Sequence, residues 1–118
     1  MSNEKVYNMF ISKVFWLLIA KAEKKGRSKS EVLEVTSWLT GYTSDEIEAA
    51  LTTDLTYGDF FRGAPAPNPN RALITGVVCG VRVEAVEDEL MREIRYLDKL
   101  VDELAKGKPM GKILRGKE

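Results

Sequence analysis

The chain contains no histidine and only one cysteine among its 118 residues. Without an imidazole, Ser-His-Asp and Cys-His catalysis, His-based pH switching and most zinc sites are excluded. The single cysteine excludes an internal disulfide framework and suits a reducing compartment. Because Cys79 lies in the apolar run from Leu73 to Val83, we expect it to be a small buried hydrophobic residue. We therefore predict no catalytic residues, no cofactor and no metal ligands, with a site built from carboxylates alone left open.

Net charge and long hydrophobic stretches are also lacking. Eighteen Lys and Arg residues balance 18 Asp and Glu residues, so no overall field attracts nucleic acid or an anionic membrane. The longest apolar run, from Val14 to Ala20, is far shorter than the roughly 20 residues needed to span a bilayer. Residues 1–4 have neither a basic lead-in nor a cleavage site, which argues against a signal peptide. We accordingly expect a cytoplasmic protein with no membrane partner.

With 44% apolar residues, a chain of this length encloses one core, so residues 1–118 are expected to form a single helical domain. From Lys5 to Lys25 the sequence lacks Gly and Pro and predicts one long helix, which ends at Gly26. Its apolar residues cover a wide arc. Four of them are aromatic: Tyr7, Phe10, Phe15 and Trp16. Such a helix is either central to the core or half covered by a partner subunit.

Two capping boxes mark the next helices. Ser28 and Glu31 form the first box and start a helix that ends before Gly41. Thr43 and Glu46 form the second box and start a short helix that reaches about residue 53. Residues 56–62 are expected to add one further turn against the core.

The middle of the chain is harder to interpret. Residues 63–70, with three prolines in alternation, predict an extended and fairly stiff internal connection. For residues 71–86 we favour a buried helix with a bent end, because Leu73, Val77 and Val81 are at helical spacing and Asn70 is a good cap. The alternative is a small hairpin at about residues 73–86, which the β-branched residues also fit; the two glycines in this segment weaken both interpretations.

The last helix has the clearest pattern. Apolar residues recur at alternating steps of four and three from Leu90 to Leu104, with charged residues between them. Gly107 and Pro109 stop this helix, and residues 110–114 are expected to dock as a final turn before a frayed tail at 115–118. The fold class we predict is an all-α bundle of about five helices, or α+β if the hairpin forms.

Several strings, in order and at fixed spacing, resemble one known family. They are VYNM at 6–9, KAEKKGR at 21–27, WLTGY at 38–42, NPNR at 68–71, ITGV at 74–77, MREIRYLDK at 91–99 and KGKPM at 106–110. Together they resemble the small uncharacterised bacterial proteins known as domain of unknown function 2200, over nearly the whole chain. The resemblance implies a bacterial cytoplasmic protein. It implies no activity, cofactor or catalytic residue.

The best candidate for a ligand site is the junction after the proline-rich connection. Free backbone N–H groups at a helix start, together with arginines, form a pocket for a phosphate or a carboxylate. The candidate residues are Asn68, Asn70, Arg71, Arg82, Glu84, Arg92, Arg95 and Tyr96. The structural alternative is stronger, because Asn-Pro-Asn is first of all a turn and cap signature and the arginines have acidic neighbours with which to pair.

Two further alternatives concern charged clusters. Glu84, Glu87 and Asp88 lie close together in the sequence and could raise one pKa among them or hold a divalent cation, but an acidic first helical turn is the favoured explanation. The basic run Lys21–Lys29 could bind nucleic acid weakly and nonspecifically, but its position at a helix end already explains it. A helix-turn-helix around Gly41 is disfavoured, since its second helix opens with carboxylates.

The function we favour from the sequence is a protein-interaction module without catalytic activity that associates with itself through the first helix. The wide apolar arc of that helix and the apolar face of the regular last helix together exceed what a chain of this size is expected to enclose completely. An unknown protein partner is the alternative occupant of that face.

Overall fold

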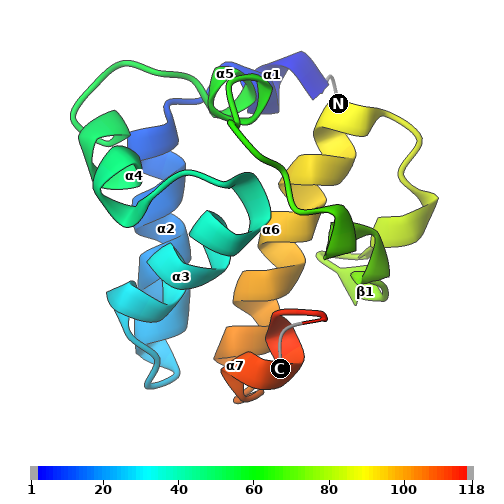
Figure 1. Ribbon diagram of the computed structural model, residues 1–118. Coiled ribbons are helices and arrows are strands. Elements are labelled where there is room, and N and C mark those ends of the chain that lie inside the picture. The colour runs from blue at the N-terminus through cyan, green and yellow to red at the C-terminus, as the bar shows by residue number, and fades with distance from the viewer. Residues whose placement is uncertain (1–2, 117–118) are drawn as a thin grey trace.

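A computed structural model describes residues 3–116 and places helix α6 (Glu89–Ala105) at the centre of the fold (Figure 1). Helices α2 (Ile11–Lys24) and α3 (Lys29–Thr40) pack along α6 and against each other. The other elements are α1 (Asn3–Tyr7), α4 (Ser44–Ala50), α5 (Tyr57–Arg62), η1 (Pro69–Leu73), β1 (Val77–Val78), β2 (Val81–Arg82), η2 (Val83–Ala85) and α7 (Met110–Ile113). The mostly helical fold class is confirmed, with one very small hairpin.

The expected single helix from Lys5 to Lys25 is wrong, because the chain breaks between α1 and α2. At the break, the Ile11 N–H donates to the Leu55 carbonyl at 2.9 Å, and the Tyr57 N–H donates to the Met9 carbonyl at 2.7 Å. These bonds form a short antiparallel bridge with the segment before α5. Backbone groups that a continuous helix would use are therefore engaged by a distant part of the chain.

Both predicted capping boxes are confirmed. Ser28 accepts from the Glu31 N–H while the Glu31 side chain accepts from the Ser28 N–H, and Thr43 and Glu46 do the same for α4. Gly41 ends α3 with a φ of 83°, in the left-handed region that favours glycine. Local sequence signals thus fix both boundaries of α3.

The favoured buried helix over residues 71–86 is wrong, and the alternative hairpin is correct. After η1, strands β1 and β2 pair antiparallel with Val78 opposite Val81. The two residues between them, Cys79 and Gly80, have φ values of 52° and 76°. Positive φ at both central residues is the geometry of a type I′ hairpin turn, which a helix cannot contain.

The turn also overturns the expectation for Cys79. We predicted a buried hydrophobic residue, but the thiol is exposed at the tip of the hairpin. The expected cap also differs, since Asn68 rather than Asn70 accepts at the start of η1, from the Asn70 N–H at 2.8 Å. Both differences follow from the absence of a helix here.

The final turn at residues 110–114 is confirmed as α7, and an ion-pair cluster holds it to α6. Glu103 is only 1% exposed. Arg115 donates to both of its carboxylate oxygens, at 2.6 and 2.7 Å, while Lys108 and Lys99 lie 3.6 and 3.9 Å from it. Arg115, which the sequence assigned to a frayed tail, is therefore anchored. Residues 117 and 118 lie outside the described residues, so for them fraying stays a prediction.

The chain covers its own core. The accessible surface is 6454 Å², against about 6,450 Å² expected for a folded monomer of this mass. The radius of gyration is 13.1 Å, close to the roughly 13.5 Å expected for this length. Within residues 3–116, no helix combines the length and the apolar character needed to cross a bilayer.

We predict that Arg115→Ala lowers the free energy of unfolding by about 2–3 kcal/mol, because it leaves the buried Glu103 carboxylate short of its best partner. Urea denaturation followed by circular dichroism measures this. Arg82→Ala is the matched control, since the Arg82–Glu84 pair is exposed; its effect should stay within about 0.5 kcal/mol. Equal effects of the two substitutions would contradict a stabilising role for the cluster.

We also predict an acid-sensitive contribution from Glu31. Hydrogen bonds from Arg27, then from the Ser28 backbone, lower the pKa of Glu31 from 4.5 to about 2. Arg27 in turn donates to the carbonyls of Leu104 and Lys108, so this pair joins the end of α2 to the end of α6. The stabilisation is fully present above pH 4.5 and is lost as the pH falls towards 2. Unfolding measured across this range should show a shallower pH dependence for Glu31→Gln, and an unchanged slope would refute this account.

Candidate functional site

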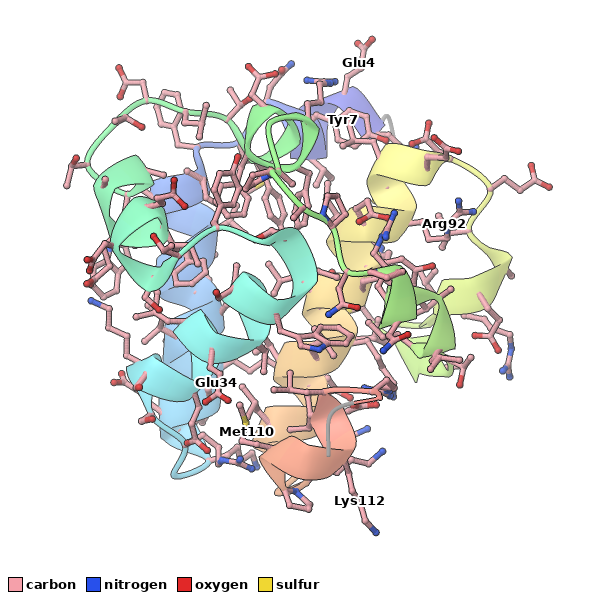
Figure 2. The ribbon with its side chains drawn as sticks, viewed as in Figure 1. Glu4, Tyr7, Glu34, Arg92, Met110 and Lys112 are labelled. Atoms are coloured by element: carbon pink, nitrogen blue, oxygen red, sulfur yellow. The ribbon has the colours of Figure 1, made fainter. Side chains whose placement is uncertain are left out.

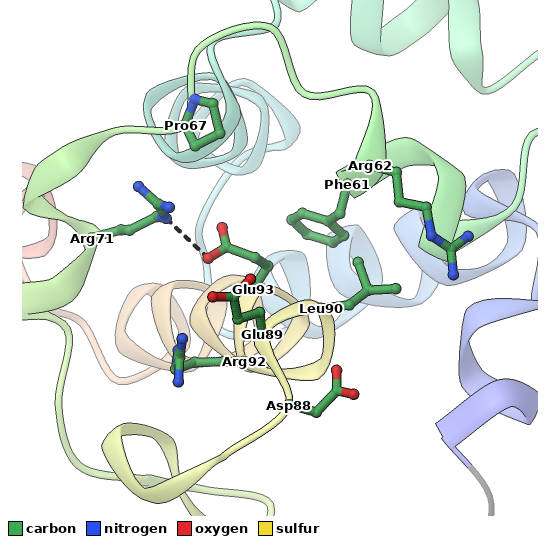
Figure 3. Close-up of a pocket in the computed structure, with 9 residues that line it drawn as sticks. All are labelled: Phe61, Arg62, Pro67, Arg71, Asp88, Glu89, Leu90, Arg92 and Glu93. Carbon is green, nitrogen blue, oxygen red and sulfur yellow. Dashed lines mark hydrogen bonds and ion pairs between the residues drawn. The ribbon is translucent and has the colours of Figure 1, made fainter.

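A hollow of about 600 Å³ lies between α5, the proline-rich connection and the first half of α6 (Figure 3). Charged and apolar side chains both line it. They are Phe61, Arg62, Pro67, Arg71, Asp88, Glu89, Leu90, Arg92 and Glu93. Backbone bonds from Ala66 and Asn68 to the carbonyls of Thr40 and Leu39, both 3.0 Å, hold the connection against the end of α3 and fix this wall. The hollow is therefore built from two regions of the sequence, residues 61–71 and residues 88–93.

Arg71 spans the hollow from η1 to α6. Its Nε donates to Glu93 at 2.9 Å and its Nη1 donates to the Asn68 carbonyl at 2.8 Å. The dashed contact in Figure 3 joins Arg71 to Glu93. This arginine is thus partly neutralised by its own neighbour, as the structural alternative predicts.

Arg92 and Glu89 have fewer partners. Arg92 donates from Nη1 to the Val86 carbonyl at 3.0 Å, which holds its guanidinium beside the loop between η2 and α6 (Figure 2). No carboxylate within residues 3–116 forms an ion pair with it, although its charge is one of the causes that lower the pKa of Asp88. Glu89 makes no hydrogen bond or ion pair with any described residue. Two opposite charges with unused bonding capacity therefore line the same hollow (Figure 3).

Asp88 closes the N-terminus of α6. Its Oδ1 accepts from the Met91 N–H at 2.9 Å and from the Tyr7 hydroxyl at 2.8 Å. The bond from the Met91 backbone, followed by that from Tyr7, lowers the pKa of Asp88. Desolvation and the bond to Asp88 raise the pKa of Tyr7. Because a carboxylate already occupies the cap, the start of α6 is a poor place for a further anion.

The structure brings two of the eight predicted site residues, Arg71 and Arg92, into this hollow. Asn68 caps η1, and the Asn70 side chain donates to the Arg115 carbonyl at 3.3 Å. Arg82 and Glu84 belong to the hairpin segment, where the Gly76 N–H donates to Glu84 at 2.9 Å and lowers its pKa. These four residues have structural contacts of their own.

The other two predicted residues, Arg95 and Tyr96, lie elsewhere on α6. Arg95 pairs with Asp98 at 3.1 Å, and both are near the buried ring of Tyr57. Desolvation by burial, opposed by Arg95, raises the pKa of Asp98. Tyr96 is buried. Neither lines the hollow, because they are on faces of α6 that pack against other elements.

Several lining residues were not predicted. The helical spacing of Glu89, Arg92 and Glu93 was a signal that one face of α6 gathers charge. Nothing local in the sequence indicated Phe61 or Pro67, which tertiary packing brings to the site. Within residues 3–116, no three Cys, Asp or Glu side chains are placed to hold a metal ion together.

A second feature is the outward face of α2. Trp16 is 52% exposed and Leu17 is 61% exposed, and Phe10 at the start of the helix is 48% exposed. Trp16 lies under the Lys29 ammonium, 5.2 Å from the ring centre, and Lys29 also pairs with Glu48 at 2.6 Å. Two large apolar side chains on α2 and one directly before it are thus left largely uncovered.

Comparison with known proteins indicates the family of the chain but no activity. A solved structure described as "Crystal structure of uncharacterized protein SP1917" is 55% identical, with a TM-score of 0.92, covering 97% of this chain and 93% of that one. No curated protein matches the chain. A family model matches residues 5–115, and the chain therefore belongs to the family described as "Uncharacterized protein conserved in bacteria (DUF2200)".

Proposed function

We propose that this protein is a non-catalytic interaction module that associates with a second copy of itself through the outward face of α2. The observation that carries the proposal is the exposure of Phe10, Trp16 and Leu17 along that face. Aromatic and aliphatic anchors of this kind are typical of the centre of a protein interface. Exposed single apolar residues are ordinary, but here two are adjacent on α2 and a third directly precedes the helix, so three lie within eight residues.

The charges beside these residues fit a second copy. Lys13 and Glu23 are both exposed on α2 and lie on either side of Trp16 and Leu17. In an antiparallel pair of α2 helices related by a twofold axis near residue 18, Lys13 of each copy meets Glu23 of the other. The same register sets Trp16 against Ala20, a small exposed residue that leaves room for the indole. This register therefore places opposite charges against each other and a large side chain against a small one.

The proposed association is reversible rather than obligatory. The accessible surface already equals that of a folded monomer of this mass, so the core needs no partner to exclude water. A patch on one helix buries less area than the roughly 1,200–2,000 Å² of stable interfaces. We accordingly expect a weak dimer whose population depends on protein concentration.

A second candidate function is binding of a small anionic ligand, favoured by the presence of Arg71 and Arg92 in one hollow. Nonspecific nucleic-acid binding through Lys21–Lys29 has less support, because three of the basic residues in that run already pair with carboxylates. Those pairs are Lys21–Asp102, Arg27–Glu31 and Lys29–Glu48. Location in the cytoplasm stays an expectation from composition.

Sedimentation velocity over rising protein concentration tests self-association. We predict that the apparent mass rises from 13.3 kDa towards twice that value, and that Leu17→Glu holds it at the monomer by placing a charge in the interface core. Leu73→Glu is the matched control, since Leu73 is similarly exposed at 56% but lies in η1. It should dimerise like the unaltered protein.

A charge exchange tests the antiparallel arrangement. Lys13→Glu should weaken dimerisation severalfold, as like charges then oppose each other, and the double variant Lys13→Glu with Glu23→Lys should restore it. An unaltered protein that stays monomeric at millimolar concentration would refute self-association. Dimerisation that Leu73→Glu abolishes and Leu17→Glu does not would place the interface elsewhere.

A further inference from the structure

We propose that the hollow beside the first half of α6 binds a small zwitterion, namely a free α-amino acid with an apolar side chain. The proposal is independent of self-association through α2. It rests on the second candidate function above and makes it specific, because it replaces a simple anion with a ligand that carries both charges. The argument comes from which charges in the hollow are already paired and which are not.

The charged side chains that line the hollow balance one another. Three arginines, Arg62, Arg71 and Arg92, face three carboxylates. Arg62 pairs with Asp59 at 2.7 Å, outside the hollow, and Arg71 pairs with Glu93 inside it. Asp88 is engaged by the α6 backbone and Tyr7. Once these contacts are counted, one carboxylate and one guanidinium remain with free bonding capacity.

These two groups are Glu89 and Arg92, three residues apart on the same helix. Residues at this spacing have Cβ atoms about 5–6 Å apart and commonly pair with each other. Here the bond from Arg92 to the Val86 carbonyl draws the guanidinium towards the preceding loop, and the pair is not made. A ligand whose ammonium and carboxylate are one carbon apart can bridge them, with its ammonium donating to Glu89 and its carboxylate accepting from Arg92.

The remaining wall of the hollow is apolar. Leu90 and Phe61 lie side by side next to the charged group, and Pro67 completes the wall across from them (Figure 3). Phe61 and Pro67 are held by α5 and by the connection, so this surface is preformed. The aliphatic side chain of a bound amino acid would be removed from water on this surface, while the ammonium and carboxylate groups of the ligand stay paired with Glu89 and Arg92. The volume, about 600 Å³, is within the range of small-molecule sites.

The same charges disfavour a phosphate. A dianion would meet Asp88, Glu89 and Glu93 around the two available arginines, one of which is already paired. The N-terminus of α6, the usual attraction for phosphate, is capped by Asp88. A ligand without net charge avoids this repulsion and still satisfies both free groups.

Titration with L-leucine, followed by amide NMR shifts at Phe61 and at 89–93, tests the proposal. We expect saturable shifts confined to this hollow. N-acetyl-L-leucine, which lacks the ammonium, and L-leucinamide, which lacks the carboxylate, should bind more than about tenfold more weakly, since each loses a charge-assisted hydrogen bond. Glu89→Gln and Arg92→Gln should weaken L-leucine binding to the same degree. Arg82→Gln, an exposed arginine outside the hollow, should leave it unchanged.

Two outcomes would overturn the proposal and are distinguishable from each other. If inorganic phosphate or N-acetyl-L-leucine binds as tightly as L-leucine, and only Arg92→Gln weakens it, the hollow is an anion site and the zwitterion is wrong. If none of the four probes shifts these amides at millimolar concentration while the spectrum remains that of the folded protein, both ligand proposals fail.

Discussion

The burial of one helix on nearly all its sides is the constraint on which this fold depends. Helix α6 is covered by α2 and α3 along its length, by α5 nearer its start, by the hairpin beside its middle, and by α7 at its end. Even a carboxylate of this helix, Glu103, is removed from solvent. Its polar residues therefore act as attachment points for neighbours: Asp102 pairs with Lys21 of α2, and Lys99 donates to the carbonyl of Val77 in β1 at 3.4 Å.

The sequence predicted those elements whose ends are determined by residues close to them in the chain. Ser28 and Thr43 carry their reciprocal glutamates, Gly41 provides the left-handed ending, and α6 has a regular apolar repeat; each signal acts within a few residues. The break before Ile11 has no such signal. Its cause is a pair of backbone bonds to Leu55 and Tyr57, more than forty positions away, which no local pattern shows.

The hairpin and the hollow likewise combine features that the local sequence predicts with features that only tertiary packing determines. Val77 and Val81 fit a helical repeat and a two-residue turn equally well, and cysteine is uncommon at the first central position of a type I′ turn, so the local pattern does not distinguish the two structures. For the candidate site, the sequence predicted Arg71 and Arg92, because arginines together with the free N–H groups of a helix start are typical of anion pockets. The expectation that Arg95 would join them failed because packing turns that side chain towards Asp98.

The tip of the hairpin provides one site for thiol-specific labelling. Since the chain has a single cysteine and its sulfur is open to solvent, a maleimide dye or nitroxide attaches there and nowhere else, with no residue replaced beforehand. The hairpin joins the central helix on a different side from α2. A label on Cys79 can therefore record the tumbling rate or the distance between two copies while leaving the exposed tryptophan face untouched.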